Sequence, residues 1–176
     1  GLISEATKKL NKSSGFLGSI FGGSSTTKYE EASELFTQAA NLYKLQRRNF
    51  EAGSAFEKAS ECQVKAGSLD EASNTLVEAY KSYKLENPSN AAKCLEKAIE
   101  MFIQRGQFRR SANFKSDLGE LYENEIQDIK SAIKSYEDAS DWYKGDGANA
   151  LSNKCLLKVA DLNCDEKIKD YKKAAT

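Results

Sequence analysis

Residues 29–43 read YEEASELFTQAANLY, and the spacing of their apolar residues decides the fold. Ala32 is followed by Phe36, Ala39 and Tyr43, at offsets of 4, 7 and 11 residues. These offsets lie on one face of a helix with about 3.6 residues per turn. The stretch therefore predicts an amphipathic helix that buries an apolar stripe.

The same stripe recurs along the chain with a period of twenty residues. Residues 129–143, IKSAIKSYEDASDWY, place residues of the same types at the same offsets: Ala132, Tyr136, Ala139 and Tyr143. Six alanines mark the period: Ala32, Ala52, Ala72, Ala92, Ala112 and Ala132. A fixed period of this length fits one helix and a tight turn, so two periods predict a helical hairpin. The helix around Ala112 fits least well, because Ser116 and Gly119 stand at two of its stripe positions.

Turn signals such as Gly67-Ser68, Asn87-Pro88 and Gly145-Asp146-Gly147 separate the predicted helices. We expect helices at about 28–45, 49–66, 69–85, 88–105, 108–124, 128–145 and 147–163, and another that begins near Asp165.

The predicted fold class is all-α, a tetratricopeptide-like right-handed solenoid in which antiparallel helices form a twisted sheet. Residues 1–27 are expected to hold the end of a truncated helix and a glycine- and serine-rich loop, and residues 28–176 the helical repeats. Because the sequence stops inside a repeat, we expect it to be part of a longer array whose C-terminal bundle is absent.

Composition narrows the possible functions. Lysine plus arginine and aspartate plus glutamate number 26 each, so the net charge is zero and no overall field attracts nucleic acid. The chain has no histidine, no phosphate-binding glycine loop and no apolar run long enough to span a membrane. We therefore expect neither an enzyme nor a bound metal or cofactor. The four cysteines (Cys62, Cys94, Cys155 and Cys164) lie on or near apolar stripes and are predicted to be reduced, buried thiols.

One loop is unusually apolar. Residues 13–25, SSGFLGSIFGGSS, carry four large apolar residues among glycines and serines, namely Phe16, Leu17, Ile20 and Phe21. Such side chains on a glycine-rich tether either fold back onto the first hairpin or insert into a bilayer or a partner groove. Insertion of two or three of them predicts weak, reversible membrane attachment that needs a second contact.

Basic residues gather at several places, including Lys44, Arg47, Arg48, Lys81, Lys84, Arg105, Arg109, Arg110, Lys115, Lys154 and Lys158. Most charged residues on helices only solvate the outer face. Hairpin alternation predicts that the turns at 46–49 and at 106 lie on opposite edges of the helical sheet. A partner that touches both must cross the broad face, which favours an acidic coiled-coil bundle over nucleic acid.

Five segments carry a resemblance to a known family: GFLGSIFGGSS, YEEASELFTQAANLYK, RGQFRRSANFK, YEDASDWYKGD and SNKCLLKVADL. Together they make the chain similar, over essentially its whole length, to the soluble NSF attachment protein (alpha-SNAP) family. The resemblance implies an adaptor that coats the SNARE four-helix bundle, of syntaxin-type and related SNAREs, and recruits the NSF-type ATPase. It also implies a role in SNARE disassembly during vesicle-mediated transport and membrane fusion, and a cytoplasmic location with peripheral attachment to the cytosolic face of membranes.

The resemblance also assigns residues. It implies that Phe16, Leu17, Ile20 and Phe21 form a membrane-attachment loop, and that the SNARE-facing surface includes Arg47, Lys84, Arg109, Arg110, Lys115 and Lys154. Gln107 and Asn113 are neutral where some family members are basic, so this segment departs from the family's charge pattern at these two positions. The family's C-terminal half, which engages the ATPase, has no counterpart in these residues, so we expect SNARE and membrane binding without ATPase stimulation.

Two other functions fit parts of the pattern. A tetratricopeptide-type co-chaperone would need basic and amide residues that converge in one concave groove to hold a peptide carboxylate. A purely structural scaffold would keep the apolar loop packed against the first hairpin.

Overall fold

The computed structural model describes residues 1–11 and 25–174, and these residues are helical throughout apart from short turns. The helices are α1 (Leu2–Asn11), α3 (Ser25–Leu45), α4 (Asn49–Ala66), α5 (Leu69–Tyr83), α6 (Pro88–Gln104), α7 (Phe108–Leu121), the π-helical turn η1 (Tyr122–Ile126), α8 (Ile129–Gly145) and α9 (Asn149–Ala174). No strand occurs within these ranges, and the predicted all-α class is confirmed. None of the helices described is long and apolar enough to cross a bilayer.

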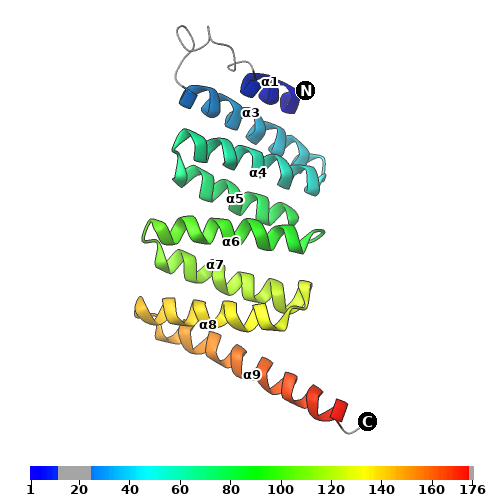
Figure 1. Cartoon of the computed structure of the whole chain (residues 1–176), viewed down its shortest axis with the longest axis vertical. Coiled ribbons are helices and arrows are strands. Elements are labelled where there is room, and N and C mark those ends of the chain that lie inside the picture. Colours follow the sequence, from blue (N-terminus) through cyan, green and yellow to red (C-terminus); the bar gives the residue numbers. More distant parts are fainter. Residues whose placement is uncertain (12–24, 175–176) are drawn as a thin grey trace. The chain divides into compact units, whose positions relative to one another are not determined.

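The chain divides into two units, Gly1–Ala98 and Ile99–Thr176. In the first unit α1, α3, α4 and α5 lie side by side, and consecutive helices from α3 onward run in opposite directions (Figure 1). In the second unit α7, α8 and α9 follow the same rule. Each unit is therefore built from the antiparallel helical hairpins that the twenty-residue period predicts.

The alanines of the period lie where neighbouring helices approach each other. All six are at most 3% exposed, and the larger stripe residues around them are buried as well. Ala32 and Phe36 of α3, for example, form one core cluster with Ala6 of α1 and Ala59 and Cys62 of α4. A methyl side chain allows close backbone approach while the larger side chains fill the space between helices. The predicted stripe is thus the hydrophobic core.

Gly119 breaks the stripe for a steric reason. A Cβ atom at this position of α7 would lie 2.8 Å from Cε1 of Tyr136 in α8, which is closer than real Cβ contacts. The tyrosine ring fills the space that the missing side chain leaves, and its hydroxyl donates to Oε2 of Glu123 at 2.6 Å. The helix around Ala112, α7, therefore departs from the repeat at Gly119 because the Tyr136 ring packs against its backbone there.

The first unit contains the same arrangement between α4 and α5. A Cβ atom at Gly53 would lie 2.6 Å from Cζ of Tyr83, and the Tyr83 hydroxyl donates to Oε2 of Glu57 at 2.7 Å. In both units the glycine stands four residues before the glutamate that accepts the hydrogen bond. One helical turn thus provides both the hollow for the ring and the partner for its hydroxyl.

Four helix ends share one turn geometry. At the end of α3 the backbone N–H of Arg47 donates to the carbonyl of Lys44 at 3.0 Å, and that of Arg48 donates to the carbonyl of Tyr43 at 2.9 Å. The corresponding pair of hydrogen bonds closes the turns at Gly67, Gly106 and Gly147. This geometry needs a residue with positive φ just after the helix, a conformation that glycine adopts without a steric penalty. Arg47, with φ of 57°, is the one non-glycine residue in this set of four.

The start of α8 is fixed by a side-chain cap. Asp128 accepts a hydrogen bond from the backbone N–H of Ser131 at 3.1 Å and another from its hydroxyl at 2.7 Å. A carboxylate in this place satisfies a helix N–H that has no backbone partner and interacts favourably with the helix dipole.

We expect Asp128→Ala to lower the free energy of unfolding by about 1 kcal/mol, because the first turn of α8 loses this acceptor. Urea denaturation followed by circular dichroism measures the effect. Asp141→Ala, which removes an exposed carboxylate from within α8, is the matched control. Equal stability of the two variants would show that the cap contributes nothing.

The structure corrects one expected boundary. A separate helix was predicted to begin near Asp165, but α9 continues without a break from Asn149 to Ala174. Residues 160–170, ADLNCDEKIKD, contain no glycine or proline, so nothing in the backbone forces a turn. The segment also has no further helix beside it among the residues described, so no packing favours a turn there.

Candidate functional site

The predicted membrane-attachment residues Phe16, Leu17, Ile20 and Phe21 lie in the segment 12–24, outside the described residues. The chain re-enters the described part at Ser25, the first residue of α3. Membrane attachment by this segment stays a prediction.

Arg47 and Lys84 lie at the same edge of the first unit. Arg47 is exposed in the turn between α3 and α4, and Lys84 is exposed directly after α5. A hydrogen bond from Nδ2 of Asn49 to Oε1 of Glu86, at 2.9 Å, joins the two turns. The Nζ atom of Lys84 lies 5.7 Å from the centre of the Tyr80 ring. The structure therefore brings these two predicted residues to one surface.

Arg109 and Arg110 lie at the start of α7 in the second unit and are both engaged by neighbours. The Arg109 guanidinium forms an ion pair with Asp146 of the turn after α8. The Arg110 guanidinium lies 4.1 Å from the centre of the Phe102 ring and 5.6 Å from that of Phe114. Both arginines line a shallow hollow of about 380 Å³ beside Asn113.

Lys115 and Lys154 differ in their freedom to meet a partner. The Lys115 ammonium lies 3.3 Å from Oδ2 of Asp138 and is largely buried. Lys154 is exposed on α9 and has no ion pair with any described residue. Cys155 of α9 contacts Ser116 of α7, with 4.0 Å between Sγ and Oγ. Because Lys154 and Lys115 directly precede these two residues, their backbones lie at neighbouring positions along α9 and α7.

These contacts rank the predicted basic residues. A cation that already holds an internal carboxylate must give it up, or share it, to bind an external one. By this criterion Lys154 in the second unit and Arg47 in the first are the cations best placed to attract an acidic partner. Arg109 and Lys115 are the least available.

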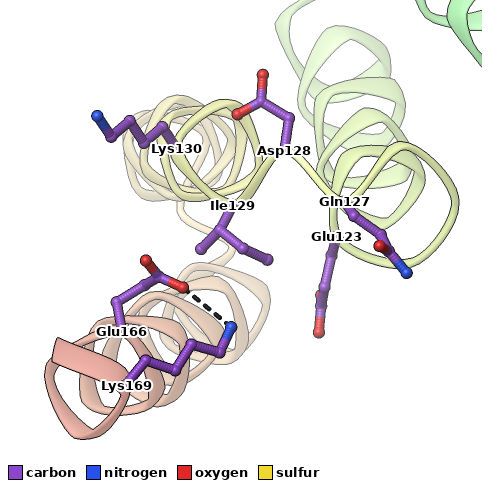
Figure 2. Close-up of a pocket in the computed structure, with 7 residues that line it drawn as sticks. All are labelled: Glu123, Gln127, Asp128, Ile129, Lys130, Glu166 and Lys169. Carbon is purple, nitrogen blue, oxygen red and sulfur yellow. Dashed lines mark hydrogen bonds and ion pairs between the residues drawn. The ribbon is translucent and has the colours of Figure 1, made fainter. Parts of the chain in front are cut away.

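A second hollow of the same unit has mixed charge and measures about 700 Å³. Figure 2 shows Ile129 between the Glu166–Lys169 ion pair of α9 and the side chain of Glu123. Burial opposes ionisation of Glu123, but hydrogen bonds from Tyr136 and Lys158 outweigh it and hold its pKa below the usual value. The residues described contain no group of three or more metal-ligating side chains. Glu123 thus acts as an internal acceptor that ties α9 to α8.

All four cysteines are free thiols, as predicted, but the expected burial holds for three of them and is wrong for Cys164. Cys62, Cys94 and Cys155 are buried free thiols, whereas Cys164 is exposed on the distal part of α9. Burial raises the pKa of the Cys94 thiol to about 12, so this group is protonated at neutral pH. Cys164 is exposed because the second half of α9 has no neighbouring helix among the residues described.

Sequence reasoning missed two leucines at the edge that carries Arg47. Leu45 and Leu85 are 82% and 83% exposed. A signal existed in the sequence: both residues fall outside the 4, 7 and 11 offsets of their stripes. The signal is weak, because single apolar residues beside turns are common on protein surfaces.

Antiparallel helical hairpins with exposed cations at their edges define a helical-repeat protein. Sequence comparison gives the family. The family model for "Soluble NSF attachment protein, SNAP" matches residues 1–176, and the chain belongs to this family.

Curated relatives agree with this assignment. A vesicular-fusion protein of Komagataella phaffii is 56% identical over 174 residues, which are 99% of this chain and 58% of that protein. The alpha-soluble NSF attachment protein of Saccharomyces cerevisiae is 51% identical, with coverage of 92% and 55%. The human alpha-soluble NSF attachment protein is 40% identical, with coverage of 90% and 53%. The chain thus spans between half and three-fifths of the length of these relatives.

The solved structures that the comparison matched are distant in sequence. The crystal structure of BtubC (BKLC) from P. vanneervenii has a TM-score of 0.49 and 15% identity, and the alignment covers 94% of this chain and 91% of that one. The DHF58 filament has a TM-score of 0.48 and 13% identity, with coverage of 99% and 96%.

Proposed function

We propose that this chain is the part of a SNARE–NSF adaptor that binds the SNARE bundle and attaches to the membrane. Membership of the soluble NSF attachment protein family over all 176 residues carries the proposal. The relatives named above are a vesicular-fusion protein and NSF attachment proteins, and the family name itself indicates attachment to NSF. The chain would act at the cytosolic face of vesicle and target membranes as a peripheral protein.

Basic side chains of the helical units attract the acidic surface of the bundle in this proposal. Lys154 supports it best, because its ammonium is exposed and has no internal carboxylate to compete with a partner. Arg47 and Lys84 add cations in the first unit, while Arg109, Arg110 and Lys115 contribute through side chains that already have internal contacts. Weak contacts of this kind become effective when they are linked.

The apolar segment supplies the second attachment. Phe16, Leu17, Ile20 and Phe21 insert into the bilayer that carries the SNAREs, and the basic surface holds the bundle above it. Because both contacts belong to one chain, each raises the effective concentration of the other, by a factor of about 10²–10⁴ in avidity. The chain spans 58% of the Komagataella phaffii relative, and we assign recruitment and stimulation of the ATPase to the remaining portion in this proposal.

Charge reversal at Lys154 tests the proposal. We expect Lys154→Glu to weaken binding to a soluble, assembled SNARE bundle about 5- to 10-fold at low salt, and less at high salt because screening reduces the attraction. Isothermal calorimetry or a pull-down with purified bundle measures the change.

Lys130→Glu, an equal change of net charge at an exposed position near the start of α8, should bind like the parent chain. Equal loss in both variants would mean that only net charge matters and would remove Lys154 from the interface. Tighter binding to a C-terminal peptide than to the bundle would favour a co-chaperone instead.

A further inference from the structure

One edge of the first unit combines exposed apolar and basic side chains. We name it the α3–α5 edge and define it by Leu45, Arg47, Lys84 and Leu85. Both leucines are more than four-fifths exposed, and they stand at turns that follow well-packed helices. Leu42 of α3 and Phe50 of α4, near the same turn, are about half exposed. An apolar group of this kind, bordered by charge, is typical of a contact surface.

Arg47 gives independent evidence that this edge is used. Its φ of 57° lies in the left-handed region, and the equivalent positions of the turns at Gly67, Gly106 and Gly147 are glycines. A side chain here costs backbone energy that glycine avoids. Residues held in such conformations cluster at functional sites. The arginine is therefore a departure from the turn chemistry of the chain that the fold itself does not need.

The charge balance indicates what the edge binds. Among the carboxylates nearby, Glu51 is paired with Arg48 at 2.7 Å, and Glu78 with Lys44 at 3.0 Å and Lys81 at 2.7 Å. Glu86 accepts a hydrogen bond from the neutral amide of Asn49 at 2.9 Å. Arg47 forms no ion pair with the part of the chain that the structure describes. The edge thus presents two exposed leucines together with a cation that holds no internal carboxylate, which complements a segment with apolar side chains and carboxylates.

The α3–α5 edge is separate from the point where the predicted membrane-attachment segment joins the unit. That segment precedes Ser25, the opposite end of a 21-residue helix from Leu45. At 1.5 Å per residue the two ends of α3 are about 30 Å apart. The exposed side chains of the edge are therefore not part of that junction.

We propose that the α3–α5 edge docks an acidic amphipathic helix of the SNARE bundle, with Leu45 and Leu85 against its apolar side chains and Arg47 against a carboxylate. The proposal rests on the proposed function, and it adds apolar anchors and a turn residue to a contact otherwise attributed to charge. Arg47 then stabilises the complex but lowers the folding stability of the unbound chain, because its backbone has a positive φ.

The leucines are tested with Leu45→Ser/Leu85→Ser and the soluble assembled bundle. We expect binding to weaken at least fivefold, with an unchanged melting temperature because both side chains are exposed. The matched control is Val64→Ser/Leu69→Ser, which removes two exposed apolar side chains at the opposite edge of the unit and should bind like the parent.

Arg47→Gly provides a second readout that a merely structural role would not give. We expect its melting temperature to rise by about 2–4 °C, since the left-handed turn is relieved, while binding to the bundle weakens at least threefold. Arg47→Lys, which keeps the charge and the strain, should retain most of the binding.

The outcomes separate the two proposals. Parent-like bundle binding by the leucine variant and by Arg47→Gly would overturn the docking surface and leave the proposed function intact. If these variants lost binding to anionic liposomes while their binding to the bundle stayed unchanged, the edge would be a lipid-binding surface. That result would also overturn the proposed docking of a SNARE helix. Failure of the parent chain to bind the bundle would overturn both.

Discussion

Replacing Phe16 and Leu17 together by serine is expected to weaken binding to liposome-anchored SNARE bundles about 100-fold, while binding to soluble bundles stays unchanged. Each large apolar side chain that leaves water contributes about 1.5–3 kcal/mol, so two inserted residues account for an effect of this size. The loss appears only where a bilayer is present, because the basic surface alone mediates binding in solution. Liposome flotation with anchored bundles, compared with a pull-down of soluble bundles, measures the difference.

Val64→Ser/Leu69→Ser is again the matched control, since it removes two apolar side chains from the surface of the first unit outside the apolar segment. It should float with anchored bundles as the parent does. Equal binding of the loop variant to anchored and soluble bundles would refute membrane attachment by this segment. It would then favour a scaffold whose segment packs against the first hairpin.

Tyr136→Ala is expected to lower the free energy of unfolding by about 3–5 kcal/mol, the largest effect on stability predicted for this chain. The ring is 1% exposed, lies against Gly119 and donates its hydroxyl to Glu123. Its removal leaves a cavity and takes away one of the hydrogen bonds to a half-buried carboxylate. Urea denaturation followed by circular dichroism gives the value.

The contact with Gly119 makes a sharper test through a double-mutant cycle. Gly119→Ala alone should cost about 1–3 kcal/mol, because its Cβ would overlap the ring. In the Tyr136→Ala background the same change should cost nothing, or stabilise α7 by up to about 1 kcal/mol through helix propensity. Gly145→Ala, where a Cβ would meet nothing within 4 Å, should instead be additive with Tyr136→Ala. Additive effects of Gly119→Ala would contradict the contact.

Sequence reasoning recovered the helices where periodicity and turn chemistry agree. Pro88 begins α6 and Gly67 ends α4 as expected, because each residue has a fixed backbone preference. It failed near Asp165, where neither glycine nor proline punctuates the repeat. There the choice between a turn and a continuing helix depends on packing, which local spacing does not report.

The basic surface was harder to predict than the core. Sequence identified Arg109 and Lys115 as basic, but their carboxylate partners, Asp146 and Asp138, lie 37 and 23 positions along the chain. Pairing across helices depends on which side chains face each other, so a one-dimensional count of charges overestimates the number available to a partner. Composition does not predict the left-handed backbone of Arg47 either. Its turn has the same geometry as the turns at Gly67, Gly106 and Gly147, where glycine makes the positive φ easier to predict.

The uneven burial of the four thiols makes Cys164 a natural attachment point for a maleimide dye or spin label. Cys62, Cys94 and Cys155 are enclosed by packed side chains, so the label reacts at one position without cysteine removal. Cys164 stands ten residues beyond Lys154 on the same helix, about 15 Å along its axis. A probe there would report the arrival of a partner at α9 by fluorescence or spin-label spectroscopy, in the unmodified sequence.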